Sequence, residues 1–130
     1  MSIQLPEEVH HPGFLTILVT GGRAFTNEDA LYEMLDHIEA MCDSRRLGMV
    51  IVQGGAQGAD KIARTWAWHN NKQLVTERAN WQQHGKGAGH RRNQAMIEKY
   101  RPDICVAMPG GRGTADMVAR CRTNNIPILQ

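Results

Sequence analysis

The chain has 130 residues, of which 42% are hydrophobic and 22% charged, as expected for one soluble globular domain with an aliphatic core. Its formal net charge of +2 is too small to predict nucleic-acid binding from overall electrostatics. No apolar run approaches the roughly 20 residues of a membrane helix. Composition therefore excludes a disordered chain, a collagen-like repeat and a membrane span.

The cysteines and the first residues indicate the cellular setting. Cys42, Cys105 and Cys121 have no C-x-x-C spacing and lie in apolar periodic segments, so we expect reduced core thiols in a cytoplasmic protein. Residues 1–13 lack the basic and then apolar pattern of a secretory signal. We interpret residues 1–13 as a flexible leader and residues 14–130 as the folded domain.

Short apolar runs alternate with segments of helical period along the domain. The expected elements are a strand at 14–20, a helix after the cap candidates Thr26 and Asn27, a strand at 49–53, a helix at 59–69, a weaker strand at 74–76, a long polar loop at 77–89, a helix at 90–101, a strand at 103–108, a helix at 114–124 and a strand at 127–129. This alternation predicts an α/β fold: a Rossmann-like, doubly wound, three-layer parallel sheet of five strands and four helices, in the order 3-2-1-4-5.

Glycine clusters follow three of the predicted strands. They are Gly21-Gly22-Arg23, Gly54-Gly55-Ala56-Gln57-Gly58-Ala59-Asp60 and Pro109-Gly110-Gly111-Arg112-Gly113-Thr114. In an open parallel sheet the carboxyl ends of the strands border the ligand crevice, where glycines let backbone N–H groups approach a phosphate. One Gly-Gly pair alone is typical of a tight turn, but three at one edge favour a nucleotide or sugar phosphate.

Other ligand chemistries find less support. There is no G-x-x-x-x-G-K-[ST] loop and no G-x-G-x-x-G after the first strand, which disfavours a dinucleotide dehydrogenase. The six histidines show no ligand spacing, and no motif demands a metal or a cofactor. Thr114 is placed as a helix cap, whose hydroxyl would bind helix N–H groups or a phosphate, and Asp116 falls in the first helical turn.

Several polar and aromatic side chains accompany the glycine loops. Arg91, Arg92 and Asn93 come at a predicted loop-to-helix entry, where arginines grip an anion or form a solvated helix end. Arg23 is a similar case. Trp81 lies in the polar loop, where it would stack on a base or cap the sheet edge.

These motifs, with Gly89-His90-Arg91-Arg92-Asn93-Gln94-Ala95-Met96 and Ala115-Asp116-Met117, resemble the YspA-related branch of the SLOG superfamily. That superfamily includes the Lonely Guy phosphoribohydrolases and the DprA proteins. The resemblance implies a Rossmann-like domain that binds nucleotide-derived ligands. The expected ligand-binding residues are Gly21, Gly22, Arg23, Gly54, Gly55, Ala56, Gly58, Asp60, Trp81, Arg91, Asn93, Pro109, Gly110, Gly111, Gly113 and Thr114.

The resemblance also implies a catalytic pair. The Lonely Guy enzymes cleave an N-glycosidic bond with an arginine and an acid, and those roles would fall on Arg92 and Asp116. These enzymes carry two consecutive glutamates where this chain has Asp116-Met117, so hydrolysis is in doubt.

Three functions therefore stay open. The first is a sensor or binding module for a nucleotide, such as a nucleoside phosphate or an ADP-ribose-like ligand. The second is a phosphoribohydrolase-like nucleotide N-glycosidase. The third, single-stranded DNA binding, is disfavoured by the near-neutral charge. The resemblance implies a homodimer, and no membrane partner is expected.

Overall fold

A computed structural model describes residues 3–130 of the chain. Its five strands form one sheet in the order β3-β2-β1-β4-β5, with every neighbouring pair parallel. The strands are β1 (Phe14–Thr20), β2 (Gly48–Gln53), β3 (Gln73–Thr76), β4 (Ile104–Ala107) and β5 (Ile128–Leu129). The predicted Rossmann-like fold and strand order are confirmed.

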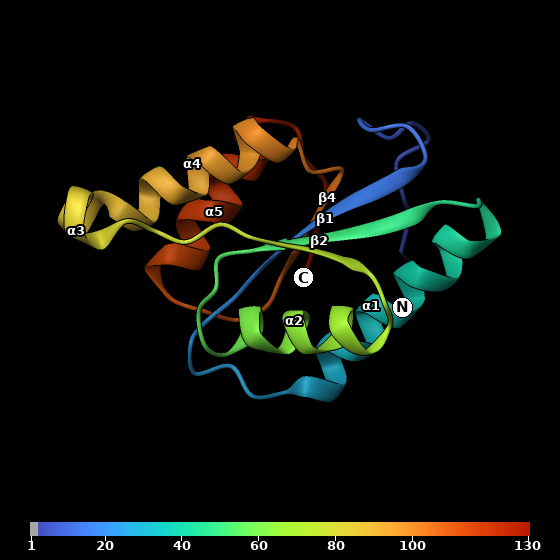
Figure 1. The fold of residues 1–130 in the computed structure, drawn as a ribbon, viewed down its shortest axis with the longest axis horizontal. Helices are drawn as coiled ribbons and strands as arrows, with labels where there is room; N and C mark the ends of the chain where they lie inside the picture. The colour runs from blue at the N-terminus through green and yellow to red at the C-terminus, as the bar shows by residue number, and fades with distance from the viewer. Residues whose placement is uncertain (1–2) are drawn as a thin grey trace.

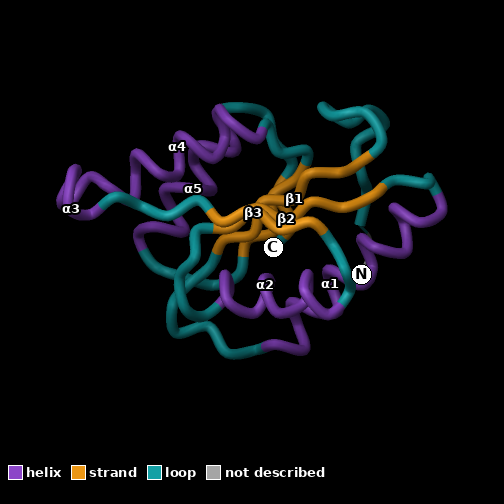
Figure 2. Tube along the Cα trace, viewed as in Figure 1, coloured by secondary structure: helices purple, strands orange, loops and turns teal. Residues whose placement is uncertain are grey.

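The helices form the two outer layers. They are α1 (Glu28–Ser44), α2 (Ala59–His69), α3 (Trp81–His84), α4 (Ala88–Tyr100) and α5 (Arg112–Thr123). Figure 1 shows α1 and α2 on one face of the sheet and α4 and α5 on the other, and the purple and orange layers of Figure 2 show the same division. The four long helices are the predicted ones, and α3 is an additional single turn.

The core divides between the two faces because side chains alternate along each strand. On β1, Leu15 and Ile17 join the cluster under α1 and α2, whereas Leu18 joins the cluster under α4 and α5. All three side chains are fully buried. An interior strand that is apolar on both faces is the feature from which the sequence predicts a three-layer sheet.

Local signals at the helix starts have mixed outcomes. Asn27 caps α1 as predicted, since its Oδ1 accepts the N–H of Ala30 at 3.1 Å. The predicted cap Thr114 is wrong, because α5 already begins at Arg112, after Gly111. The predicted loop at 77–89 is also partly helical: it contains α3 and a 3-10 turn at Gly85–Gly87, and α4 begins at Ala88.

The leader makes defined contacts from Ile3 onward; Met1 and Ser2 lie outside the described residues. Ile3 is buried against the α1 face of the core. The buried Asp103 accepts the N–H of His10 at 2.8 Å, and it also accepts the N–H of Thr16 in β1 at 2.8 Å. One carboxylate thus ties the leader to the central strand.

Two general expectations concern the described part of the chain. Within residues 3–130, no helix combines the length and apolar character needed to cross a membrane. Cys42, Cys105 and Cys121 are all buried and unpaired, in agreement with the predicted core thiols.

Gly58, the residue before α2, gives a first prediction. Its φ is +76°, and a Cβ there would collide with the carbonyl oxygen of Gly22 in the first loop. We expect Gly58→Ala to lower the free energy of unfolding by about 3 kcal/mol or more, because the left-handed backbone and the steric clash both cost energy. Urea denaturation measures this loss.

Gly85 provides the matched control. Its φ is +53°, but nothing lies within 4 Å of the position that a Cβ would take. Gly85→Ala should therefore cost only about 1 kcal/mol, from the backbone conformation alone. Equal losses in the two variants would contradict close packing between the first and second loops.

Candidate functional site

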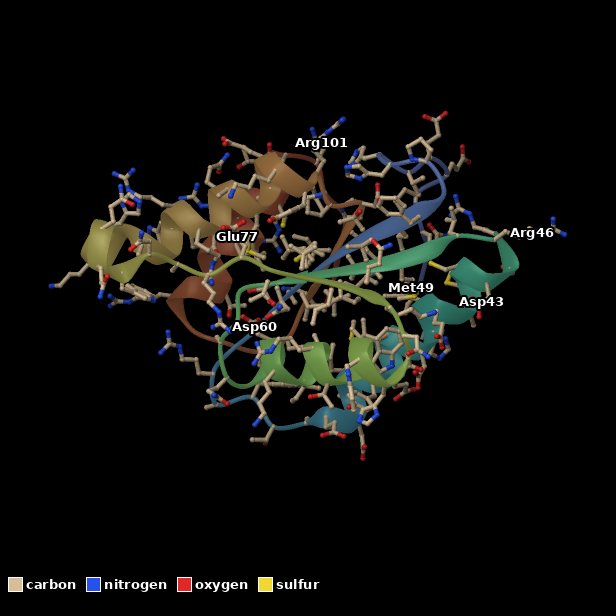
Figure 3. The ribbon with its side chains drawn as sticks, in the orientation of Figure 1. Asp43, Arg46, Met49, Asp60, Glu77 and Arg101 are labelled. Atoms are coloured by element: carbon tan, nitrogen blue, oxygen red, sulfur yellow. The ribbon has the colours of Figure 1, made fainter. Side chains whose placement is uncertain are left out.

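A cleft of about 620 Å³ opens at the carboxyl edge of the sheet. All three predicted glycine loops contribute to its wall, as do α3 and α4. Its lining comprises Thr20, Gly21, Gly22, Arg23, Gly54, Gly55, Ala56, Asp60, Arg78, Ala79, Trp81, Gly89, Arg92, Asn93, Gly111, Gly113 and Thr114. In Figure 3, the labelled Asp60 and Glu77 lie at this side of the molecule, far from Arg46.

The loop after β2 is held by its own side chains. The Asp60 Oδ2 accepts the N–H groups of Gly54 at 3.1 Å and Ala56 at 3.2 Å. The N–H of Gly55 donates to Gln53 Oε1 at 2.7 Å. These three N–H groups already have acceptors, so this loop forms a wall of the cleft and does not present them to a phosphate.

Arg92 extends from α4 to the same loop. Its Nη1 donates to the carbonyl oxygen of Gly54 at 3.0 Å, and its Nε donates to Asn93 Oδ1 at 3.0 Å. A Cβ on Gly54 would collide with this guanidinium, so the glycine permits the close approach. Among residues 3–130, no carboxylate oxygen lies within 4.0 Å of an Arg92 guanidinium nitrogen, so Arg92 forms no ion pair there.

The cleft is locally cationic despite the small net charge of the chain. Arg23, Arg78 and Arg92 line it, and Asp60 is its single lining carboxylate. Burial lowers the pKa of Arg92; the Asp60 carboxylate opposes this effect and the Arg23 guanidinium adds to it. Because arginine stays protonated in proteins, this environment favours binding of an anion.

The start of α5 supplies free donors. Its first intrahelical hydrogen bond runs from the Ala115 N–H to the Gly111 carbonyl oxygen at 3.0 Å. The N–H groups of Arg112, Gly113 and Thr114 therefore precede the helical ladder. Within residues 3–130, no side chain caps this helix end. Thr114, which does not act as the predicted cap, lines the cleft. Together with the helix dipole, these donors suit a phosphate.

Trp81 begins α3 at the outer wall of the cleft. The residue is 52% exposed, although its indole lies over Gly89 of α4. A large exposed indole that lines a cleft can stack on a flat ring.

Asp116 does not line the cleft and acts on it through neighbours. Its Oδ2 accepts hydrogen bonds from Arg120 Nε at 2.8 Å and from Asn93 Nδ2 at 2.9 Å. Asn93 Nδ2 also donates to the carbonyl oxygen of Gly113 at 3.2 Å. With its amide nitrogen held there, Asn93 turns its oxygen toward Arg92. Asp116 therefore orients the Arg92 guanidinium through Asn93.

The structure thus brings most predicted residues together and leaves others beside the cleft. The predicted residues that do not line it are Gly58, Arg91, Pro109, Gly110 and Asp116. Sequence reasoning missed Arg78, whose Nη1 donates to the carbonyl oxygen of Gly55 at 3.1 Å. Arg78 follows β3 closely, and this position at a strand end could have indicated a place in the cleft. The sequence has no glycine cluster there, so this strand end was not predicted to contribute. Within residues 3–130, no His, Cys, Asp and Glu side chains gather in a group that could hold a metal ion.

The role of Asp116 can be tested without a ligand. We expect Asp116→Ala to shift or broaden the Arg92 Nε–H signal in a ¹⁵N–¹H NMR spectrum, because Asn93 loses the carboxylate that fixes its amide. Loss of these hydrogen bonds should also lower stability by about 1–2 kcal/mol. The matched control is Glu33→Ala, which removes an exposed carboxylate from α1, on the opposite face of the sheet. An Arg92 signal unchanged in Asp116→Ala would contradict this positioning role.

The same interaction has a defined pH dependence. Burial tends to raise the pKa of Asp116, but the hydrogen bonds from Arg120 and Asn93 outweigh it and hold the pKa below its usual value. The contribution of Asp116 to stability is therefore complete above the ordinary carboxyl pKa of about 3.9 and is lost as the pH falls through the lower folded value. The Arg92 signal should follow that acid transition.

Comparisons with known proteins agree with this architecture. The X-ray structure of TM1055, a Northeast Structural Genomics Consortium target, shares the fold with a TM-score of 0.64 at 11% identity, covering 88% of this chain and 72% of that one. The "Gene 61 protein" of Mycobacterium phage D29 is 36% identical over 121 residues, which cover 87% of this chain and 93% of that protein. The YspA, cpYpsA-related SLOG family matches residues 15–84, which include the first two glycine loops and Trp81. The chain therefore belongs to the YspA, cpYpsA-related SLOG family.

Proposed function

We propose that the protein binds a nucleotide or nucleotide-derived ligand in this cleft, as a sensor or binding module. The observation that carries the proposal is Arg92: a partly buried guanidinium without an ion-pair partner among residues 3–130, in the same cleft as the uncapped start of α5. Both features favour an anion, and a volume of about 620 Å³ suits a small molecule.

The charges suggest an orientation for the ligand. The phosphate would lie at the start of α5, where the N–H groups of the first turn precede the helical ladder and where Arg23 lines the same cleft. The base would lie against Trp81. SLOG membership supports the nucleotide-related role, and the exposure of Trp81 supports stacking.

Tryptophan fluorescence and calorimetry with AMP and ADP-ribose test the proposal. Binding should quench the indole emission, and Trp81→Ala should weaken binding by about 10-fold or more, since stacking on an aromatic side chain contributes about 1–3 kcal/mol. Trp68→Ala is the matched control, because Trp68 is 74% exposed on α2 and does not line the cleft. Absence of binding across both probes, or equal loss in the two variants, would overturn the proposal.

Nucleotide N-glycosidase activity is a second candidate, supported by Arg92 in the cleft. Its proposed acid, Asp116, is already bound to Arg120 and Asn93 and does not line the cleft, so binding without hydrolysis is the better-supported function. We expect chromatography to detect no adenine release from AMP. Release that Asp116→Asn abolishes would instead establish the hydrolase.

The remaining expectations on partners stay predictions. The homodimer follows from the family resemblance and is one of them. Single-stranded DNA remains a disfavoured ligand, because the formal net charge of the chain is only +2.

A further inference from the structure

Asp60 has one carboxylate oxygen that the fold does not use. The residue is only 6% exposed, and its Oδ2 is engaged by the N–H groups of Gly54 and Ala56. Oδ1 accepts no hydrogen bond from residues 3–130. Every side-chain oxygen in that range that is sealed from solvent has a hydrogen-bond partner, so Oδ1 is not sealed from solvent. Asp60 lines the cleft, which gives a ligand there access to this side chain.

The strand order places this oxygen in the middle of the site. Trp81 follows β3, Asp60 follows β2, and the start of α5 follows β4, in a sheet ordered β3-β2-β1-β4. From β3 to β4 there are three inter-strand spacings, about 14 Å in all. A nucleotide with its base at Trp81 and its phosphate at α5 therefore has its sugar beside Asp60.

The chemistry of a carboxylate fits that position. An ionised Asp accepts hydrogen bonds and donates none, so it repels a phosphate and attracts hydroxyl groups. We propose that Asp60 accepts hydrogen bonds from the ribose hydroxyls of the ligand and thereby makes the site selective for ribonucleotides over 2′-deoxyribonucleotides. This inference rests on the proposed nucleotide binding and adds the class of sugar.

The environment of Asp60 supports the assignment. The backbone bonds to Oδ2 fix the carboxylate plane, so a hydroxyl meets an acceptor that is already oriented. The guanidinium of Arg92 lies across Gly54 and partly compensates the buried negative charge. Burial raises the pKa of Asp60, which means that this carboxylate lacks full solvation and gains from an additional donor.

Calorimetry with AMP and 2′-deoxy-AMP tests the inference on the unmodified protein. Removing one hydroxyl that donates to a charged acceptor should weaken binding by about 10- to 100-fold. Ribose 5-phosphate and 2-deoxyribose 5-phosphate provide a second pair without a base, and they should show the same direction.

Asp60→Asn links the selectivity to this residue. The amide oxygen can still accept from the loop N–H groups, but the amide nitrogen replaces the free acceptor, so the ratio of the two affinities should fall to within about 3-fold of one. Asp29→Asn is the matched control, because Asp29 is also the second residue of a helix but is exposed and outside the cleft. It should keep the wild-type ratio. Circular dichroism checks that each variant is folded.

The outcomes separate the two proposals. Equal binding of AMP and 2′-deoxy-AMP by the wild-type protein would overturn the role of Asp60 while leaving nucleotide binding intact, and it requires no variant. Selectivity for AMP over 2′-deoxy-AMP that is retained in folded Asp60→Asn would also overturn it. No binding of any nucleotide would instead refute the proposed function.

Discussion

Gly54 lies between a buried carboxylate and a partly buried guanidinium, and the geometry of the cleft depends on this arrangement. Its N–H donates to Asp60 and its carbonyl oxygen accepts from Arg92. One peptide segment thus connects α2 to α4 across the end of β2. Two charges of opposite sign are held close by backbone groups and not by a direct ion pair, so each side chain keeps polar atoms for a ligand.

The second support comes from between α4 and α5. Arg120, Asp116 and Asn93 form a chain of hydrogen bonds that ends at the Arg92 guanidinium. Arginine can only donate and an ionised aspartate can only accept. The Asn93 amide therefore has one orientation, with its oxygen toward Arg92 and its nitrogen toward Asp116. Arg92 is therefore held from two sides, by the β2 loop and by this chain. A side chain with that many restraints meets a ligand with little loss of conformational entropy.

Much of this site was predictable from local sequence. The apolar run of β1, the alternation of elements and the three glycine clusters are properties of neighbouring residues, and they indicated the strand order and the edge of the sheet that carries the cleft. Arg78 and the hydrogen bonds around Asp116 were not predictable, because they depend on how α4, α5 and the β3 loop pack together. Thr114 was misplaced because the two glycines before α5 hide its true start.

In the loops after β2 and β4, the residue at which the following helix begins determines what the aspartate of the loop binds. Both loops have the pattern Gly-Gly-x-x-x-Ala-Asp, from Gly54 to Asp60 and from Gly110 to Asp116. In the first, α2 begins at Ala59, so the Asp is the second helical residue and its carboxylate reaches back to the loop N–H groups.

In the second loop, α5 begins at Arg112, and the Asp is the fifth helical residue. It therefore lies one turn further on and pairs sideways with Arg120, four residues away, as helical spacing dictates. Asp60 accepts N–H groups of its own loop, whereas Asp116 accepts none of the N–H groups at the start of α5. Two nearly identical motifs thus become opposite surfaces of one cleft: a carboxylate that accepts donors, and a helix end that donates to an anion.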